Sequence, residues 1–339
     1  MNRAISTALA DAMAADPSVV VFGEDVAAAE GPFKTSEGLV ARFGPSRVRD
    51  TPISEMAFTG AAVGAAMHGL KPVVEIMFME FLGVALDQLV TQAAKMRYLS
   101  GGQYHVPMVL RASVGSGTGF GCQHSQTLEN WVSATPGLSV VSPSDAQSAY
   151  SLLRAAIEDP DPVVVLEPRV LYGARSEVDP SITLAIGRAR TLREGSEVTL
   201  VALGRTTGIA QAAAEELADA GIDCEVIDLL TLVPLDRAAV LASVRRTGRL
   251  VVVDDSPLSG GWGHEVVSLC ATEAFSALQA SPIRVCAPDV PVPYGKALEA
   301  RYAPSAAEVV HQCRALIRDG AAPPAWWIRD GLHMEGGMA

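Results

Sequence analysis

Short apolar runs rich in valine and isoleucine alternate with helical stretches along almost the whole chain. Each run is bounded by glycine or proline, as is typical of strands buried on both faces. Strands separated by helices form parallel sheets that helices cover on both sides, so the alternation predicts an α/β fold with doubly wound parallel sheets. In the first half, the expected strands are Val19–Phe22, Val73–Ile76, Val106–Leu110, Leu138–Val141 and Val163–Leu166. The expected helices there are Ala4–Ala14, Glu55–His68, Phe81–Leu99 and Ala146–Glu158.

The alternation is interrupted at the polar segment 173–180 and resumes clearly at Val198. A chain of 339 residues has the length of two ordinary domains. We therefore expect two doubly wound parallel-sheet domains, at residues 1–180 and 190–320, followed by a C-terminal tail at 321–339.

Composition excludes several classes of protein. The formal net charge of −12 argues against a nucleic-acid partner. Lys, Asp or Glu interrupts every apolar run, so we expect no membrane span. The five cysteines are far apart and lack zinc-site spacing, which favours a reducing compartment. The start of the chain shows no signal-peptide pattern, and we expect a cytoplasmic protein. A content of 49% hydrophobic residues favours a large subunit interface.

A single acid stands at the start of a helix that is otherwise small and apolar. Pro52 disfavours helix before it and Ser54 is a good N-cap, so Glu55 should be the first helical residue. A carboxylate there would be partly desolvated and could exchange a proton with a bound heterocycle. The alternative is that Glu55 only complements the helix dipole in water. The small residues that would let a flat ring or another backbone approach are Gly60, Ala61, Gly64 and Ala65.

Several further runs share one family's order and spacing. They are Gly-Glu-Asp-Val at 23–26, Arg47 to Glu55, Gly69 to Glu75, 87–102, Gln-His-Ser-Gln at 123–126 and 136–143. On these runs, the chain resembles the beta subunits of thiamine-diphosphate-dependent 2-oxoacid dehydrogenases. The resemblance covers nearly the whole chain. It implies a transketolase-like pyrimidine-binding domain followed by a transketolase C-terminal domain.

The resemblance assigns roles to three side chains. Glu55 would hydrogen-bond N1′ of the cofactor's aminopyrimidine, which makes it both catalytic and cofactor-binding. His124 would lie near the thiazolium end, where it would position or protonate substrate-derived groups and assist acyl transfer to a lipoyl group. Phe81 would form an aromatic wall for the aminopyrimidine. A structural or surface histidine and a core phenylalanine are the alternatives for the last two.

The resemblance also implies partners and ions. The family holds magnesium and the cofactor's diphosphate on an alpha subunit through a Gly-Asp-Gly motif, which this chain lacks. We therefore expect an alpha2-beta2 heterotetramer that docks on a lipoyl acyltransferase core. Some relatives bind potassium at a helix end, where free carbonyls favour a cation, although a plain capped turn is the alternative. The residues at the matching positions are Met108, Ala156, Ile157, Asp159 and Asp161.

The expected reaction is oxidative decarboxylation of a 2-oxoacid, or cleavage of acetoin, with acyl transfer to lipoamide. The run 75–84 and Gln123 resemble the enzymes for pyruvate and acetoin more than those for branched substrates. A thiamine-diphosphate-dependent carboligase or transketolase-type subunit is one alternative, and a non-catalytic structural subunit is another. A Rossmann oxidoreductase is disfavoured because no strand is followed by GxGxxG.

Overall fold

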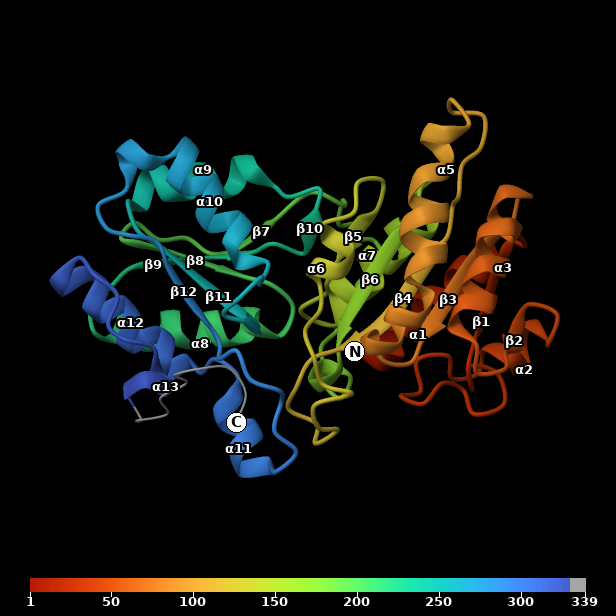
Figure 1. Ribbon diagram of the computed structural model, residues 1–339, viewed down its shortest axis with the longest axis horizontal. Coiled ribbons are helices and arrows are strands. Elements are labelled where there is room, and N and C mark those ends of the chain that lie inside the picture. Colours follow the sequence, from red (N-terminus) through yellow and green to blue (C-terminus); the bar gives the residue numbers. More distant parts are fainter. Residues whose placement is uncertain (330–339) are drawn as a thin grey trace. The chain divides into compact units, whose positions relative to one another are not determined.

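The computed structural model describes residues 1–329, which form two compact units, each built on one sheet (Figure 1). The chain crosses between the units more than once, because a short segment of each half groups with the other unit. The first unit consists of residues 1–115, 128–188 and 230–234, and the second of 116–127, 189–229 and the residues from 235 onward. The expected domain bounds at 180, 190 and 320 stay a prediction.

The first unit contains a seven-stranded sheet in the order β10-β5-β6-β4-β3-β1-β2. Its strands pair in parallel except for β10, which lies antiparallel to β5 at one edge. The predicted doubly wound parallel fold is confirmed, and the antiparallel edge strand is an addition to it. The strands are β1 (Val19–Gly23), β2 (Val48–Asp50), β3 (Lys71–Ile76), β4 (Val109–Val114), β5 (Ser139–Val141), β6 (Val163–Pro168) and β10 (Thr231–Val233).

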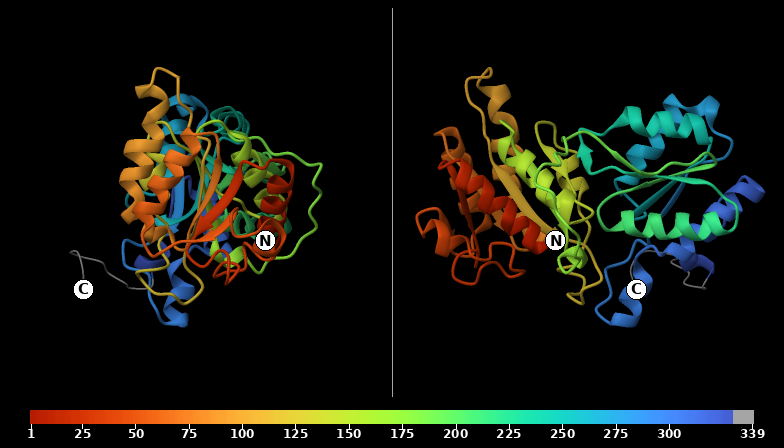
Figure 2. Two further views of the ribbon diagram at one scale, coloured as in Figure 1. Left: turned by 90° about the vertical axis from the view of Figure 1, so that its right-hand side faces the viewer. Right: turned by 180° about the vertical axis from the view of Figure 1, so that it is seen from behind.

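Helices cover both faces of this sheet because successive strand residues point to opposite sides. Val73 packs into a cluster with α1 (Asn2–Ala15) and α7 (Ala146–Glu158), whereas Val74 packs into a cluster with α3 (Glu55–Met67) and residues 82–99. Figure 2 shows α1 beside α7 and, on the other face, α3 beside the helical stretch 82–99. The remaining helices of this unit are α2 (Leu39–Phe43), α4 (Leu82–Leu86), α5 (Ala94–Leu99), α6 (Asn130–Ser133), and the 3₁₀ turns η1 (Met79–Phe81) and η3 (Arg169–Leu171).

Two elements of this unit differ from the expected pattern. The predicted helix Phe81–Leu99 is helical from Leu82, but its middle third, Asp87–Ala93, is a π-helix. The strand expected at Val106–Leu110 begins only at Val109. Pro107 has no N–H to donate, and the Met108 N–H instead bonds Val106 O at 2.7 Å, so the chain turns before it pairs.

A buried ionic network joins three central strands. The Arg111 guanidinium on β4 donates to Glu75 on β3 at 2.7 Å and to both oxygens of Glu167 on β6 at 2.7 and 2.9 Å. The Tyr172 hydroxyl donates to Glu167 at 2.7 Å, and the Thr35 hydroxyl donates to Glu75 at 2.9 Å. Arg111 is fully buried, and removal of one partner from such a set costs about 3–5 kcal/mol. The network therefore fixes the spacing of these strands.

The second unit has a five-stranded sheet in the order β12-β11-β8-β9-β7, in which only β7 is antiparallel to its neighbour among the described residues. Helices α8 and α12 pack on one face, and α9 and α10 cover the other (Figure 1). Its strands are β7 (Arg190–Arg193), β8 (Val198–Ala202), β9 (Cys224–Asp228), β11 (Leu250–Pro257) and β12 (Ile283–Ala287). Its helices are α8 (Arg205–Asp219), α9 (Arg237–Thr247), α10 (Gly263–Glu273), η4 (Phe275–Ala277), α11 (Lys296–Tyr302), α12 (Ala306–Asp319) and α13 (Trp326–Arg329).

The first part of the expected tail is folded against the second unit. Trp327 in α13 is buried, and Arg329 forms an ion pair with Glu308 of α12. Residues 330–339 lie outside the described part of the chain. Within residues 1–329, no helix combines the length and the apolar character needed to cross a membrane.

Candidate active site

The carboxyl ends of the parallel strands in the first unit meet at one edge of the sheet, and the candidate acids follow them directly. Glu24 comes after β1, Glu55 opens the helix after β2, and Phe81 ends the turn after β3. β1 lies between β2 and β3, so the chain passes across β1 on its way from β2 to β3. Such a change of direction is where open α/β sheets bind their ligands.

Glu55 is the first residue of α3, as predicted, and its side chain is only 6% exposed. The predicted reason for this start is wrong in part, because the Ser54 hydroxyl at the N-cap makes no capping hydrogen bond. Pro52 and the carboxylate's own interaction with the helix dipole remain as the local causes. A buried acid at a helix start differs from the solvated acid of the alternative interpretation.

Glu24 is a second acid beside Glu55 that the sequence analysis missed. Its Oε1 is buried and has no hydrogen-bond partner among the described residues. Burial raises the pKa of Glu24, and the nearby charges of Glu55 and, less strongly, Asp25 raise it further. The sequence feature that points to Glu24 is its place directly after a buried strand, in Gly23-Glu24-Asp25. Two carboxyl groups thus share one partly desolvated region.

The face of α3 that carries small residues is open to solvent at some positions and covered by another side chain at others. Ala57, Ala61 and Gly64 are exposed, and a Cβ added at Gly64 would meet no atom within 4 Å. A Cβ at Gly60 would lie 2.8 Å from Gln88 Oε1, so that side chain occupies the space there. The surface beside Glu55 is therefore thin enough for a flat ring or a second backbone only along part of the helix.

Phe81 is half-buried and packs edge-on against Phe78, with 6.1 Å between the ring centres. It also lies against the apolar cluster that contains α3. The part of its ring that remains accessible can line a site, and the buried part belongs to the core. Both interpretations of Phe81 therefore stay open.

His124 belongs to the second unit, whereas Glu55 and Phe81 belong to the first. It lies in segment 116–127, is half-buried, and its backbone N–H donates to Gly121 O at 3.3 Å. The sequence alone gave no sign that this segment groups with the C-terminal half of the chain.

The expected potassium residues come together at the opposite, amino-terminal edge of the first sheet. Met108 precedes β4, and the other four surround the end of α7 just before β6. Pro160 has no N–H, and the Asp161 N–H bonds Asp159 Oδ1 at 2.9 Å. The usual helical donors to the carbonyls of Ala156 and Ile157 are therefore unavailable. Burial raises the pKa of Asp159, and the charge of Asp161 adds to this.

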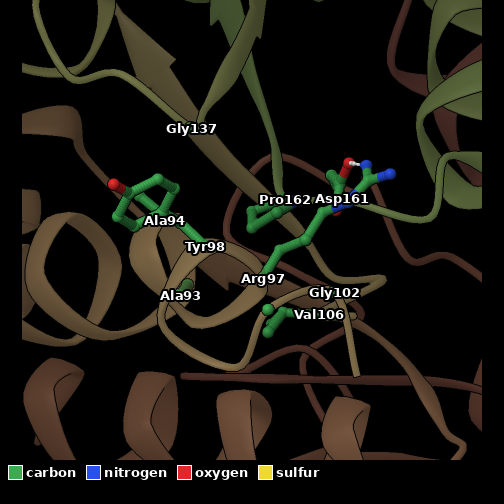
Figure 3. A pocket seen from close by; sticks show the side chains of 10 residues that line it. Ala93, Ala94, Arg97, Tyr98, Gly102, Val106, Gly137, Asp161 and Pro162 are labelled. Atoms are coloured by element: carbon green, nitrogen blue, oxygen red, sulfur yellow. Dashed lines mark hydrogen bonds and ion pairs between the residues drawn. The ribbon is translucent and has the colours of Figure 1, made fainter. Parts of the chain in front are cut away.

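A pocket of about 500 Å³ opens beside this helix end. Arg97, Tyr98, Asp161 and Pro162 line the pocket, and Figure 3 shows the Arg97 and Asp161 side chains in contact there. The guanidinium of Arg97 pairs with the Asp161 carboxylate, and His105 Nδ1 lies 3.5 Å from the same group. Asp161 is thus already neutralised, and a cation here would depend mainly on carbonyl oxygens. Residues 1–329 contain no cluster of three or more His, Cys, Asp or Glu side chains that could hold a metal.

Comparison with known proteins identifies the family. Residues 1–175 match the transketolase pyrimidine-binding domain, and residues 187–309 match the transketolase C-terminal domain. The mitochondrial pyruvate dehydrogenase E1 component subunit beta-1 of Arabidopsis thaliana is 45% identical over 315 residues, which cover 91% of this chain and 87% of that protein. The beta subunit of acetoin:2,6-dichlorophenolindophenol oxidoreductase from Cupriavidus necator is 42% identical over 331 residues, with 94% and 98% covered.

A solved split-gene transketolase, described as an inactive beta4 tetramer, superposes with a TM-score of 0.76 at 27% identity and covers 92% of this chain and 96% of its own. Together with the domain matches and the relatives, this shows that the chain belongs to the transketolase-like beta-subunit family of thiamine-diphosphate-dependent 2-oxoacid dehydrogenases. The expected family, fold class and enzyme class are confirmed.

The charge of Glu55 contributes to the raised pKa of Glu24 at the carboxyl edge. Replacement of Glu55 by Gln removes the like charge beside Glu24, so the titration midpoint of Glu24 should fall, while burial keeps it above that of an exposed glutamate. Carboxyl ¹³C NMR of glutamate-labelled chain, with Glu24→Gln for assignment, measures the midpoint. Asp25→Asn should produce a smaller fall. An unchanged midpoint in Glu55→Gln would show that the carboxyl groups do not interact.

Proposed function

We propose that this chain supplies the pyrimidine-side half of a thiamine diphosphate site, with Glu55 as the acid that hydrogen-bonds the aminopyrimidine. The observation that carries the proposal is the buried Glu55 carboxyl at the start of α3, with the buried, unpartnered Glu24 oxygen beside it. Orphaned polar atoms at the carboxyl edge of a parallel sheet fit a bound polar heterocycle.

When bound, thiamine diphosphate supplies a nucleophilic carbon that attacks a carbonyl and accepts the resulting negative charge. Glu55 would hydrogen-bond a ring nitrogen of the aminopyrimidine and so favour the imino tautomer, whose nitrogen can take the proton from the reactive carbon. Burial and the charge of Glu55 raise the pKa of Glu24, so a protonated Glu24 is favoured beside the proposed site. Phe81 would contact the ring, and His124 would hold or move a proton near the substrate.

We propose pyruvate as the substrate, with acetoin as the next candidate. The run 75–84 and Gln123 favour both over branched 2-oxoacids, and relatives named for both are similar to the chain at 42–45% identity. A biosynthetic carboligase or transketolase-type subunit is the second candidate function, favoured by the likeness to a split-gene transketolase.

We propose an alpha2-beta2 assembly in which an alpha subunit holds the diphosphate and magnesium and a lipoyl acyltransferase core receives the acyl group. The absent Gly-Asp-Gly motif and the exposed side chains of Ile53 (86%) and Met56 beside Glu55 support it. We also propose a cytoplasmic location, supported by five cysteines that are all free. Cell fractionation tests the location, and recovery with a sealed organelle would contradict it.

The activity of the reconstituted enzyme tests the function. With a candidate alpha subunit, thiamine diphosphate and Mg²⁺, reduction of an artificial electron acceptor should proceed with pyruvate or acetoin. Glu55→Gln should lower kcat by roughly 10²–10⁴-fold, because it removes a proton-transferring acid. Glu37→Gln, an exposed acid of the same unit, is the matched control and should keep full activity. Carboligation without acceptor reduction by a cofactor-loaded tetramer would favour the second candidate.

We propose a structural potassium ion at the end of α7, held by carbonyl oxygens of Met108, Ala156 and Ile157 and by the polar side chains of Asp159 and Asp161. The lack of helical donors to two of these carbonyls supports it. The melting temperature should be a few degrees higher in KCl than in NaCl of equal ionic strength, since a ligand of the folded state stabilises it. Equal melting temperatures in the two salts would refute the site.

A further inference from the structure

Segment 116–127, which carries His124, is anchored to the second unit near both of its ends. At the start, Arg205 Nη1 donates to Ser116 O at 3.0 Å and to Ser116 Oγ at 3.2 Å. At the end, the Thr127 hydroxyl donates to Asp255 O at 3.1 Å. Asp255 Oδ2 also lies 3.6 Å from Arg205 Nε, so one strand end serves both anchors.

Between these anchors, the glycine-rich loop folds around a carboxylate of the same chain. Gly117 and Gly119 have φ values of +98° and +78°, a backbone conformation that disfavours other residues. Their N–H groups converge on Glu299, with 2.7 Å from Gly117 N to Oε1 and 3.0 Å from Gly119 N to Oε2. Converging backbone amides of this kind form an anion-binding concavity. The loop therefore binds an anionic group, and that group is the Glu299 carboxylate of the same chain.

The loop and the acid depend on each other energetically. The Glu299 side chain lies on α11 and is 5% exposed. A buried carboxylate is unfavourable without hydrogen-bond donors, and hydrogen bonds to a charged acceptor are about twice as strong as neutral ones. Loss of the Glu299 charge would leave the two amides without their acceptor. The path of the loop up to Gly119 is thus set by a residue 180 positions further along the chain.

We propose that Glu299 is a positioning residue for His124. It holds the start of the loop that carries the imidazole, and the Tyr294 ring packs beside Gly121, where an added Cβ would lie 3.1 Å from Tyr294 Cδ2. The catalytic part of this inference rests on the proposed function, whereas the contact between Glu299 and the loop does not. A displacement of about 1 Å in a catalytic group costs roughly 10²-fold in rate. The second unit would then contribute to catalysis through the position of His124.

Two variants of Glu299 and one control test the proposal in the reconstituted tetramer. Glu299→Ala removes both acceptor oxygens, whereas Glu299→Gln keeps one of them at nearly the same place. Lys296→Gln changes the charge of an exposed residue on the same helix and is the control. Hydrogen–deuterium exchange of peptides that cover 115–127 reports on the loop without reference to activity. Circular dichroism and melting curves report whether each variant folds.

Glu299→Ala should speed exchange in the loop peptides by about tenfold or more, Glu299→Gln should have a smaller effect, and Lys296→Gln none. The kcat should fall about tenfold or more in Glu299→Ala, less in Glu299→Gln, and not at all in Lys296→Gln. In all three variants, KM and cofactor affinity should stay within about twofold of the wild-type values. Unchanged loop exchange in Glu299→Ala overturns the contact. Faster exchange with unchanged kcat overturns the positioning role. Absence of turnover in the wild type would refute the proposed function, while the exchange data would still decide the contact.

Discussion

Parallel strand pairing is the constraint on which the first unit depends. Because β1, β2 and β3 run in the same direction, the segments that follow them emerge at one edge of the sheet. That edge receives two acids and an aromatic ring from segments more than twenty residues apart, and Arg111 holds β3, β4 and β6 together behind it through two buried carboxylates. The amino-terminal edge receives the end of α7 and its carbonyl groups instead. The two edges of one sheet thus carry a candidate active site and a candidate ion site.

The sheet also explains why the acids at its carboxyl edge lie in apolar surroundings. Strands buried on both faces leave few polar groups near the edge, so a carboxyl group there is poorly hydrated. Burial and the nearby charge of Glu55 act in the same direction and raise the pKa of Glu24. A carboxyl group in such surroundings is suited to the proton exchange with a ring nitrogen that we propose for this edge.

The local pattern predicted the parts of the fold that local sequence determines. The strand runs, α7 at Ala146–Glu158 and the start of α3 at Glu55 follow from side-chain periodicity and from Pro52. The π-helical turn at Asp87–Ala93 and the antiparallel strand β10 do not, because they depend on packing and on pairing with residues far along the chain. Glu24 was missed because an acid after a strand is common, and only its burial sets it apart. The family resemblance, and not spacing, supplied the roles of His124 and Phe81.

The contact between Glu299 and the glycine loop lies beyond local sequence analysis for the same reason. The acceptor of the loop amides comes from α11, about 180 residues further along the chain. A segment between two strands of the first unit is thereby held by the second. The candidate catalytic loop and the unit that holds it are therefore far apart in sequence.

The central claim is that this chain carries half of a cofactor site and needs an alpha subunit for the other half. Calorimetric titration of thiamine diphosphate with Mg²⁺ into this chain alone, into a candidate alpha subunit alone and into their equimolar mixture tests it most directly. Micromolar or tighter binding (on the order of −8 kcal/mol) is expected only for the mixture. Equally tight binding to this chain alone would show that it does not need an alpha subunit to complete the cofactor site.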